Sequence, residues 1–141
     1  LVQSVTRKYL KKQIIGENYI QSSENVLDYL RHNLRDRGRE VFLVVLLNGR
    51  NQVLDIVELF EGTLTTSAVY TREVIKLILE KDAAVVIFVH NHPSGNPNPS
   101  KDDQNLTQKL KAACSTIDVQ LHDHLIIAGN DYTSMADKGM V

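Results

Sequence analysis

The stretch that decides the fold is residues 83–103, Ala83-Ala-Val-Val-Ile-Phe-Val-His-Asn-His-Pro-Ser-Gly-Asn-Pro-Asn-Pro-Ser-Lys-Asp-Asp103. Its first seven residues form an apolar, largely β-branched run, which is typical of a strand buried on both faces. Three prolines and a glycine then prevent regular structure until Ser100, whose hydroxyl is suited to cap a following helix. The sequence therefore predicts a buried strand, a rigid loop and a helix.

Metal-ligating residue types gather where these predicted elements meet. Side chains alternate across a strand, so His90 and His92 project to one side and can converge on one ion, while Asn91 points away. The apolar residues of the following helix repeat with a helical period: Leu106, Leu110, Ala113, Cys114 and Ile117. Asp103 lies on the same stripe and should face inward, whereas Asp102 is rotated by about 100°. Two imidazoles and one carboxylate leave the fourth tetrahedral position of one Zn²⁺ per chain to water.

Each part of this pattern also has an ordinary structural explanation. Ser100 to Asp103 reads as a plain helix start, with a serine N-cap and acidic residues favoured by the helix dipole. A single histidine at a strand end is more often a satisfied polar residue than a ligand. The combination of a His-x-His pair, a rigid loop and an inward aspartate nevertheless favours a metal site.

The spacing also resembles a known signature. His90-x-His92-Pro93, six residues, Ser100, two residues and Asp103 is similar to the JAMM signature of the JAB/MPN metalloprotease superfamily. Four segments resemble its bacterial RadC branch: His-Asn-His-Pro-Ser-Gly, Phe60-Glu61-Gly62-Thr63, Arg72-Glu73-Val74 and Asp123-His124-Leu125-Ile126-Ile127. The resemblance runs from about Val26 to the C-terminus and departs at Asn91, where most members have Ser or Thr. It implies a JAB/MPN fold, similar to cytidine deaminases, and a zinc-dependent hydrolase of peptide or isopeptide bonds.

Glu40 stands at the entry of a buried strand, where the local pattern gives no reason for a charge. The pattern alone also permits a solvated strand end that pairs with Arg37 or Arg39. In the resembling family, a glutamate that opens the first strand acts as general acid/base, and Glu40 matches that position. Glu58 and Glu61 are rivals, but the superfamily pattern places nothing catalytic there. We therefore expect Glu40 to be the general acid/base.

Other residues are expected to support the site. The Ser100 hydroxyl could stabilise the oxyanion of amide hydrolysis in addition to capping the helix. His122 and His124 form a second His-x-His pair on one face of a predicted strand, but no carboxylate follows at comparable spacing. We therefore expect His124, with Asp123 and Asn91, to support the ligands without binding the ion.

Composition bounds the class of protein. The 141 residues suffice for one domain with a real core, 43% of them are hydrophobic, and no apolar run approaches 18 residues. The chain starts without a signal-peptide pattern, so we expect a bacterial cytoplasmic protein without a membrane partner. Cys114 is the single cysteine, which excludes a disulfide framework and the cysteine-ligated zinc site of nucleobase deaminases.

The charge distribution suggests one alternative function. The net charge is −1, but residues 1–50 hold nine of the 16 Lys/Arg and five of the 17 Asp/Glu. Eight of these cations could contact phosphate: Arg7, Lys8, Lys11, Lys12, Arg31, Arg35, Arg37 and Arg39. Aromatic residues are sparse among them and no base-stacking motif is present. The alternative is a non-catalytic, metal-stabilised module that binds DNA or a repair partner, as the repair label of the RadC family suggests.

The remaining chain supplies the rest of a single α/β domain. Residues 1–21 are expected to be an N-terminal arm or helix, and residues 22–141 the JAB/MPN domain. A helix should run from a cap at Ser22 to Gly38, two strands should meet at an Asn48-Gly49 turn, and Thr71 should cap another helix. With strands over 84–90 and 119–128, and a short one possible after 128, these elements predict a central mixed sheet flanked by helices.

Overall fold

The fold is a five-stranded mixed sheet with helices on both faces, which confirms the predicted α/β class. The computed structural model describes residues 2–62 and 69–141, so Thr63 of the RadC-like segment lies outside them. The described elements are α1 Val2–Ile14, α2 Ser23–Leu34, β1 Val41–Leu47, β2 Val53–Glu61, α3 Thr71–Glu80, β3 Val85–Asn91, α4 Lys101–Thr116, β4 Gln120–Ala128 and β5 Asp131–Ser134. The described strands have the order β2-β1-β3-β4-β5, and of the four pairings among them only β3 with β4 is parallel.

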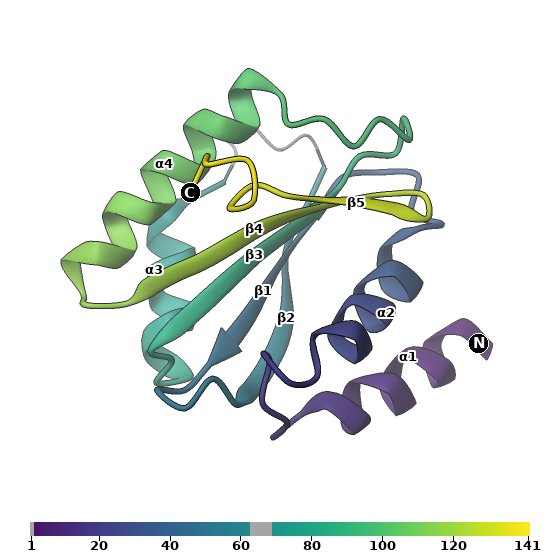
Figure 1. Cartoon of the computed structure of the whole chain (residues 1–141), viewed down its shortest axis with the longest axis horizontal. Coiled ribbons are helices and arrows are strands. Elements are labelled where there is room, and N and C mark those ends of the chain that lie inside the picture. The colour runs from purple at the N-terminus through teal and green to yellow at the C-terminus, as the bar shows by residue number, and fades with distance from the viewer. Residues whose placement is uncertain (1, 63–68) are drawn as a thin grey trace.

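Two apolar layers cover the sheet. Helices α1 and α2 pack on one face and α3 and α4 on the other (Figure 1). Every residue of β1 and β3 is buried, because helices cover both faces of these central strands. The segment expected to be an arm or helix forms α1, and its Ile14 is 2% exposed within the core under α2.

The connection from β3 through α4 to the parallel strand β4 positions the site. In such a unit the loop after the first strand and the start of the helix meet at the carboxyl end of the parallel strands. That loop runs from residue 92 to residue 100, and α4 then returns across the face that α3 also covers. Among the described residues, no helix combines the length and the apolar character that a membrane span requires.

Two predicted helix caps are wrong. Helix α2 ends at Leu34, where Arg35 stays right-handed and the Arg37 amide closes a turn onto the Leu34 carbonyl, so Gly38 caps nothing. Thr71 is the first helical residue of α3, and Tyr70 takes the N-cap position without a side-chain hydrogen bond. Both errors arise because a cap depends on the path of the incoming or outgoing chain, which local composition describes poorly.

The hairpin between β1 and β2 forms as expected, but its turn is longer than the Asn48-Gly49 pair. The Asn51 amide donates to the Asn48 carbonyl at 2.9 Å, and Asn51 adopts a φ of 60°. The Asn48 side chain accepts hydrogen bonds from the amides of Arg50 and Gln52. This side chain therefore organises the turn, and asparagine tolerates the left-handed conformation that Asn51 adopts.

Candidate metal centre

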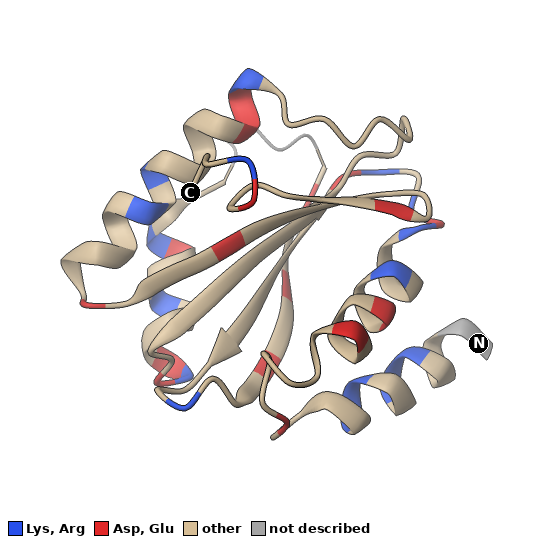
Figure 2. Ribbon diagram, viewed as in Figure 1, with Lys and Arg blue, Asp and Glu red and all other residues tan. Residues whose placement is uncertain are grey.

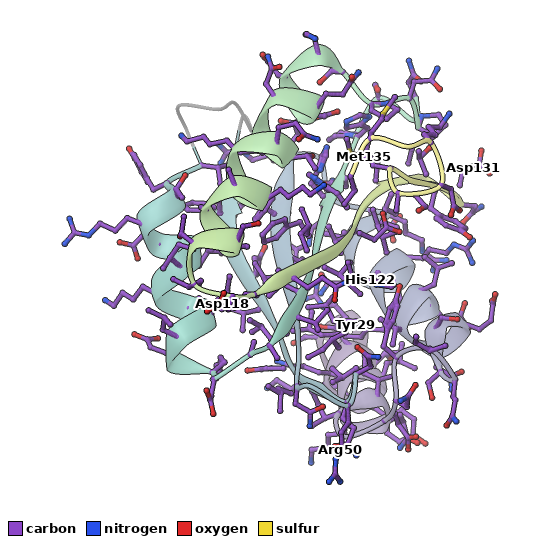
Figure 3. The ribbon with its side chains drawn as sticks, turned by 60° about the vertical axis from the view of Figure 1, so that its left-hand side comes forward. Tyr29, Arg50, Asp118, His122, Asp131 and Met135 are labelled. Carbon is purple, nitrogen blue, oxygen red and sulfur yellow. The ribbon has the colours of Figure 1, made fainter. Side chains whose placement is uncertain are left out.

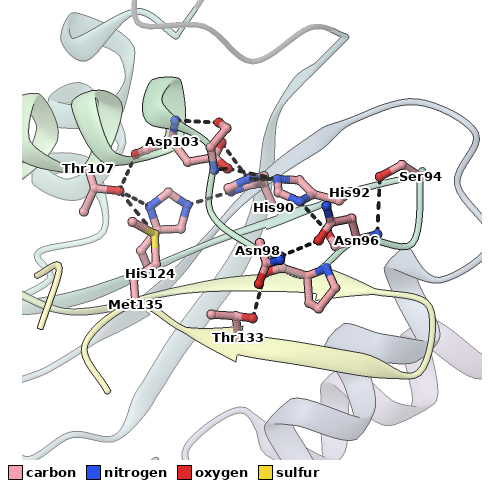
Figure 4. Close-up of polar contacts among 12 residues, drawn as sticks. His90, His92, Ser94, Asn96, Asn98, Asp103, Thr107, His124, Thr133 and Met135 are labelled. Atoms are coloured by element: carbon pink, nitrogen blue, oxygen red, sulfur yellow. Dashed lines mark hydrogen bonds and ion pairs between the residues drawn. The ribbon is translucent and has the colours of Figure 1, made fainter. Parts of the chain in front are cut away.

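Three predicted donors meet at the end of β3. The Nε2 atoms of His90 and His92 lie 3.1 Å apart, and they lie 3.1 and 3.0 Å from Oδ1 and Oδ2 of Asp103. One donor atom from each residue falls within 4.8 Å of the others (Figure 4). His90 and Asp103 are buried and His92 is half-buried, so the group lies just below the protein surface and could hold one metal ion.

The helix start aims the aspartate. The Ser100 hydroxyl accepts a hydrogen bond from the Asp103 amide at 3.0 Å, and the Ser100 amide donates to Asp103 Oδ2 at 2.8 Å. This reciprocal capping box fixes the first turn of α4 and turns the carboxylate toward the histidines. Ser100 and Asp103 therefore form an ordinary helix cap, and the same geometry leaves the Asp103 carboxylate facing the two histidines as a metal ligand would.

The rigid loop orients His92. Its Nδ1 lies 2.7 Å from the backbone carbonyl of Asn96, and a carbonyl can only accept, so Nδ1 carries a proton. In the neutral ring, Nε2 then presents an electron pair to the other two donors. The loop is itself tied to β5, because the Thr133 hydroxyl donates to the carbonyl of Pro97 at 2.7 Å (Figure 4).

His124 lies behind His90. Its Nε2 is 2.7 Å from Nδ1 of His90, and its Nδ1 is 2.6 Å from the hydroxyl of Thr107 on α4. All three side chains are fully buried. The ring of His124 also makes edge contacts with Phe42 and Phe88, so core packing as well as hydrogen bonding holds it in place. His124 therefore contacts the candidate ligand His90 directly, and its supporting role stays a prediction.

The expectation that His122 and His124 share a face is wrong. In the pairing with β3, Val86 lies opposite Leu121 and the next residue, Ile87, lies opposite Asp123. The extra residue is a bulge at position 122, and a bulge breaks the alternation of side chains. His122, which is labelled in Figure 3, is consequently exposed. Its ring lies edge-on to the ring of Tyr19, with the two ring centroids 5.7 Å apart.

Asp123 does not reach the donors. Its carboxylate accepts hydrogen bonds from the Ser134 hydroxyl and from the amides of His124 and Ala136. It also lines a small pocket on the α2 side of the sheet, opposite the side on which His124 meets α4. Asp123 thus holds the end of the β4–β5 hairpin. We expected it to support the metal ligands, but none of its described hydrogen bonds involves His90, His92 or Asp103.

Glu40 lies just before β1 and is half-buried. The β1–β3 pairing ends at Phe42 and His90, and Glu40 lies two residues before Phe42, close enough for its charge to act on His92. The rival Glu58 on β2 is in an ion pair with Arg37 at 2.8 Å. This ion pair accounts for the position of Glu58, whereas the charge of Glu40 acts on the donor residue His92.

Asn91 fixes the backbone on both sides of Glu40. Its side-chain oxygen accepts from the Val41 amide at 2.6 Å, and its side-chain amide donates to the Arg39 carbonyl at 3.0 Å. The β1–β3 ladder ends at Phe42, so the amide side chain replaces the next ladder bonds. A serine or threonine hydroxyl is shorter and has a single proton, so it would not span both groups in this way.

A pocket opens beside these residues. Its volume is about 450 Å³, and its lining residues are Gly38, Arg39, Glu40, Gly62 and Pro93. Pro93 directly follows the donor His92, and the Gly62 amide holds the carbonyl of Glu40 at 2.8 Å. The pocket therefore offers space for a bound group beside Glu40 and beside Pro93, the residue that follows the donor His92.

The electrostatics of the cluster favour a cation. Burial alone would raise the pKa of Asp103, but the ring nitrogens of His90 and His92 beside its carboxylate, together with the Ser100 amide, hold this pKa well below its usual range. The hydrogen bond to Asp103 raises the pKa of His92 above 6.5, against the opposing effect of burial. Burial lowers the pKa of His124 well below 6.5, so this ring is neutral. The ionised aspartate gives the cluster a negative charge that a cation neutralises.

The basic residues of the first 50 positions are partly engaged within the fold. Lys11 pairs with Asp55 at 2.8 Å, Arg37 pairs with Glu58, and the guanidinium of Arg31 lies 5.3 Å from the centre of the Tyr132 ring. Figure 2 shows the remaining basic residues of α1 along a helix that lies away from the donor end of β3. Cys114 is buried, as expected, and burial raises its pKa to about 11.

Fold and donors together define a JAB-type α/β domain with a candidate metal site. Residues 20–140 match the model of the RadC-like JAB domain family, and the chain belongs to this family. It is 43% identical to a UPF0758 protein of Idiomarina loihiensis over all 141 residues, which are 63% of that relative. It is 49% identical to a UPF0758 protein of Shewanella baltica over 137 residues, covering 97% of this chain and 61% of the relative. The chain thus spans about three-fifths of these relatives' length.

Proposed function

We propose that this domain is a zinc-dependent metallohydrolase that cleaves peptide or isopeptide bonds. The observation that carries the proposal is the convergence of two imidazole nitrogens and a carboxylate within 3.0–3.1 Å. His92 carries its proton on the opposite nitrogen, so its electron pair faces an ionised oxygen. Such a contact is repulsive until a cation or a proton lies between the atoms. Two histidines and one carboxylate with an open fourth position suit catalytic zinc.

The residues around the donors match the needs of amide hydrolysis. Zinc bound by His90, His92 and Asp103 would lower the pKa of its water from about 15.7 to about 7. Glu40 would take up the proton of the attacking water and return it to the leaving amine. The Ser100 hydroxyl is free to donate while its oxygen accepts from Asp103, so it could hydrogen-bond the oxyanion.

The experiment compares two glutamate-to-glutamine variants. Glu40→Gln preserves size and hydrogen bonding but removes the base, so it should keep its zinc and lose about 10²-fold to 10⁴-fold in amide hydrolysis. Glu58→Gln is the matched control, because the same chemical change breaks an ion pair on β2 away from the donors. It should hydrolyse at the wild-type rate. Equal loss in both variants, or no loss in Glu40→Gln, would contradict the proposed role.

The same variant can capture the substrate. Glu40→Gln should retain uncleaved protein conjugates from a bacterial lysate, because binding does not require the base, and mass spectrometry would identify them. Wild-type protein should release them as products. If instead both proteins retain nucleic acid equally, with salt-sensitive affinity and no peptide turnover, the alternative of a DNA-binding module would be correct.

A further inference from the structure

We infer that Thr107 determines which nitrogen of His90 carries a proton, and that it thereby keeps the His90 Nε2 electron pair available to a metal ion. Thr107 lies on α4, and its hydroxyl is connected to the His90 ring through His124. This role rests on the proposed metal site. Thr107 acts on a ligand through another side chain, so it is a positioning residue and not itself a ligand. A chain of hydrogen bonds runs from the candidate ligand His90 through the side chains of His124 and Thr107 to the backbone carbonyl of Asp103, which is also a candidate ligand (Figure 4).

The direction of the hydrogen bonds begins at the threonine. Its Oγ1 lies 2.7 Å from the Asp103 carbonyl and 2.6 Å from Nδ1 of His124. The carbonyl can only accept, so the single hydroxyl proton must point to it; otherwise two oxygens would face each other without a hydrogen. The hydroxyl oxygen must then accept from His124, which places a proton on Nδ1. Met135 Sδ, at 3.6 Å, is a more distant and weaker acceptor.

The next step fixes His90. A neutral imidazole carries one proton, so a protonated Nδ1 leaves Nε2 of His124 as an acceptor. That atom lies 2.7 Å from Nδ1 of His90, which must therefore donate. The remaining nitrogen of His90, Nε2, is left unprotonated and faces His92 and Asp103. A hydroxyl two hydrogen bonds away thus selects the metal-binding tautomer.

Burial makes this selection strict. His90, His124 and Thr107 are each 0% exposed, so water cannot replace a lost partner. Without the threonine oxygen, the Nδ1 proton of His124 would be buried without an acceptor. The other tautomer avoids this problem but puts a proton on Nε2 of His124, facing the proton on His90. His90 must then move its own proton to Nε2, where it blocks the metal.

The first test uses two replacements of one side chain. Thr107→Val keeps the shape and removes the hydroxyl, whereas Thr107→Ser keeps the hydroxyl. Zinc dissociation constants, measured on metal-free protein against a chromophoric chelator, should be about 10-fold to 100-fold weaker for the valine variant and close to wild type for serine. Thr116→Val controls for substitution on the same helix, because the Thr116 hydroxyl bonds only to the neighbouring Ala113 carbonyl among its described contacts. Thr107→Val that binds zinc as tightly as wild type would overturn the inference.

The second test reads the tautomers without metal and without activity. Histidine-¹⁵N NMR at about pH 8 should show the proton on Nδ1 of both His90 and His124 in the metal-free wild type. In Thr107→Val both rings should move the proton to Nε2, and Thr107→Ser should restore the wild-type pattern. A wild-type His90 protonated on Nε2 would overturn the inference whatever the zinc affinity. If the tautomers are as stated but zinc fails to bind the wild type, the proposed metal site is wrong instead.

Discussion

The chain contains two His-x-His pairs of identical spacing, and the structure uses them differently. His90 and His92, at the end of β3, bring their Nε2 atoms within 3.1 Å of each other. On β4, His122 contacts Tyr19 near the surface while His124 is buried behind His90. Equal spacing therefore does not define equal sites. Alternation places two side chains together only where the strand is regular, and β4 is interrupted at the residue between Leu121 and Asp123.

The largest expected effect comes from removing one histidine of each pair. His92→Ala should abolish zinc binding, as should His90→Ala and Asp103→Ala, because two ligands do not hold zinc tightly. His122→Ala should bind one zinc per chain like the wild type. Elemental analysis of the purified variants, with thermal unfolding to verify folding, provides the measurement. Metal lost from His122→Ala and retained by His92→Ala would reverse the assignment of the two pairs.

A second difference is that only the first pair is followed by a capped helix. Ser100→Ala should lower the free energy of unfolding by about 1 kcal/mol, because the cap of α4 is lost. It should also raise the barrier to hydrolysis by about 2.7–4 kcal/mol if the hydroxyl serves the oxyanion. Ser100→Gly should largely restore the cap. A glycine variant with normal stability and normal turnover would exclude the oxyanion role, and one with normal stability and reduced turnover would support it.

The pH dependence of zinc binding should report on His92. Its raised pKa stabilises the metal-free fold below about pH 6.5, and this contribution is lost as the pH rises through the raised value. Below that pKa, zinc must also displace the proton, so its affinity should fall up to about tenfold per pH unit. The increase in melting temperature caused by zinc should therefore be larger at pH 8 than at pH 5.5. His122→Ala should show the same trend, and a larger increase at pH 5.5 would contradict it.

The smallest expected effect concerns the exposed member of the second pair. His122→Ala removes an edge contact with the Tyr19 ring and should destabilise the protein by about 0.5 kcal/mol. His122→Phe keeps a ring there and should lie within about 0.5 kcal/mol of the wild type. Chemical unfolding would measure both values. A loss of several kcal/mol in either variant would mean that His122 has a buried structural role.

The sequence predicted the donors because their positions follow from strong local rules. A continuous apolar run fixes β3, strand alternation fixes the common side of His90 and His92, and helical periodicity turns Asp103 inward. The same rules predicted the sheet and its helices. The family resemblance was needed to single out Glu40, because the local pattern also allowed a solvated strand end.

What the sequence did not predict depends on contacts between distant segments. The bulge at His122 arises from pairing between β3 and β4, and no local residue type marks it. Thr107 lies four residues after Asp103 on the inward face of α4, so helical periodicity could have predicted that it is buried near the site. Its role depends on the contact with His124 of β4, which the local sequence does not reveal. The end of α2 before Gly38 likewise depends on the turn closed by Arg37.

The most direct measurement is X-ray absorption at the zinc edge on protein reconstituted with one equivalent of metal. Ligation by His90, His92 and Asp103 predicts two imidazole nitrogens and two oxygens, one from the carboxylate and one from water, at about 2.0–2.2 Å. His122→Ala should give the same spectrum. A third imidazole in the shell would show that His124 is a ligand, and a sulfur at about 2.3 Å would implicate Cys114. Either result would contradict the metal site described here.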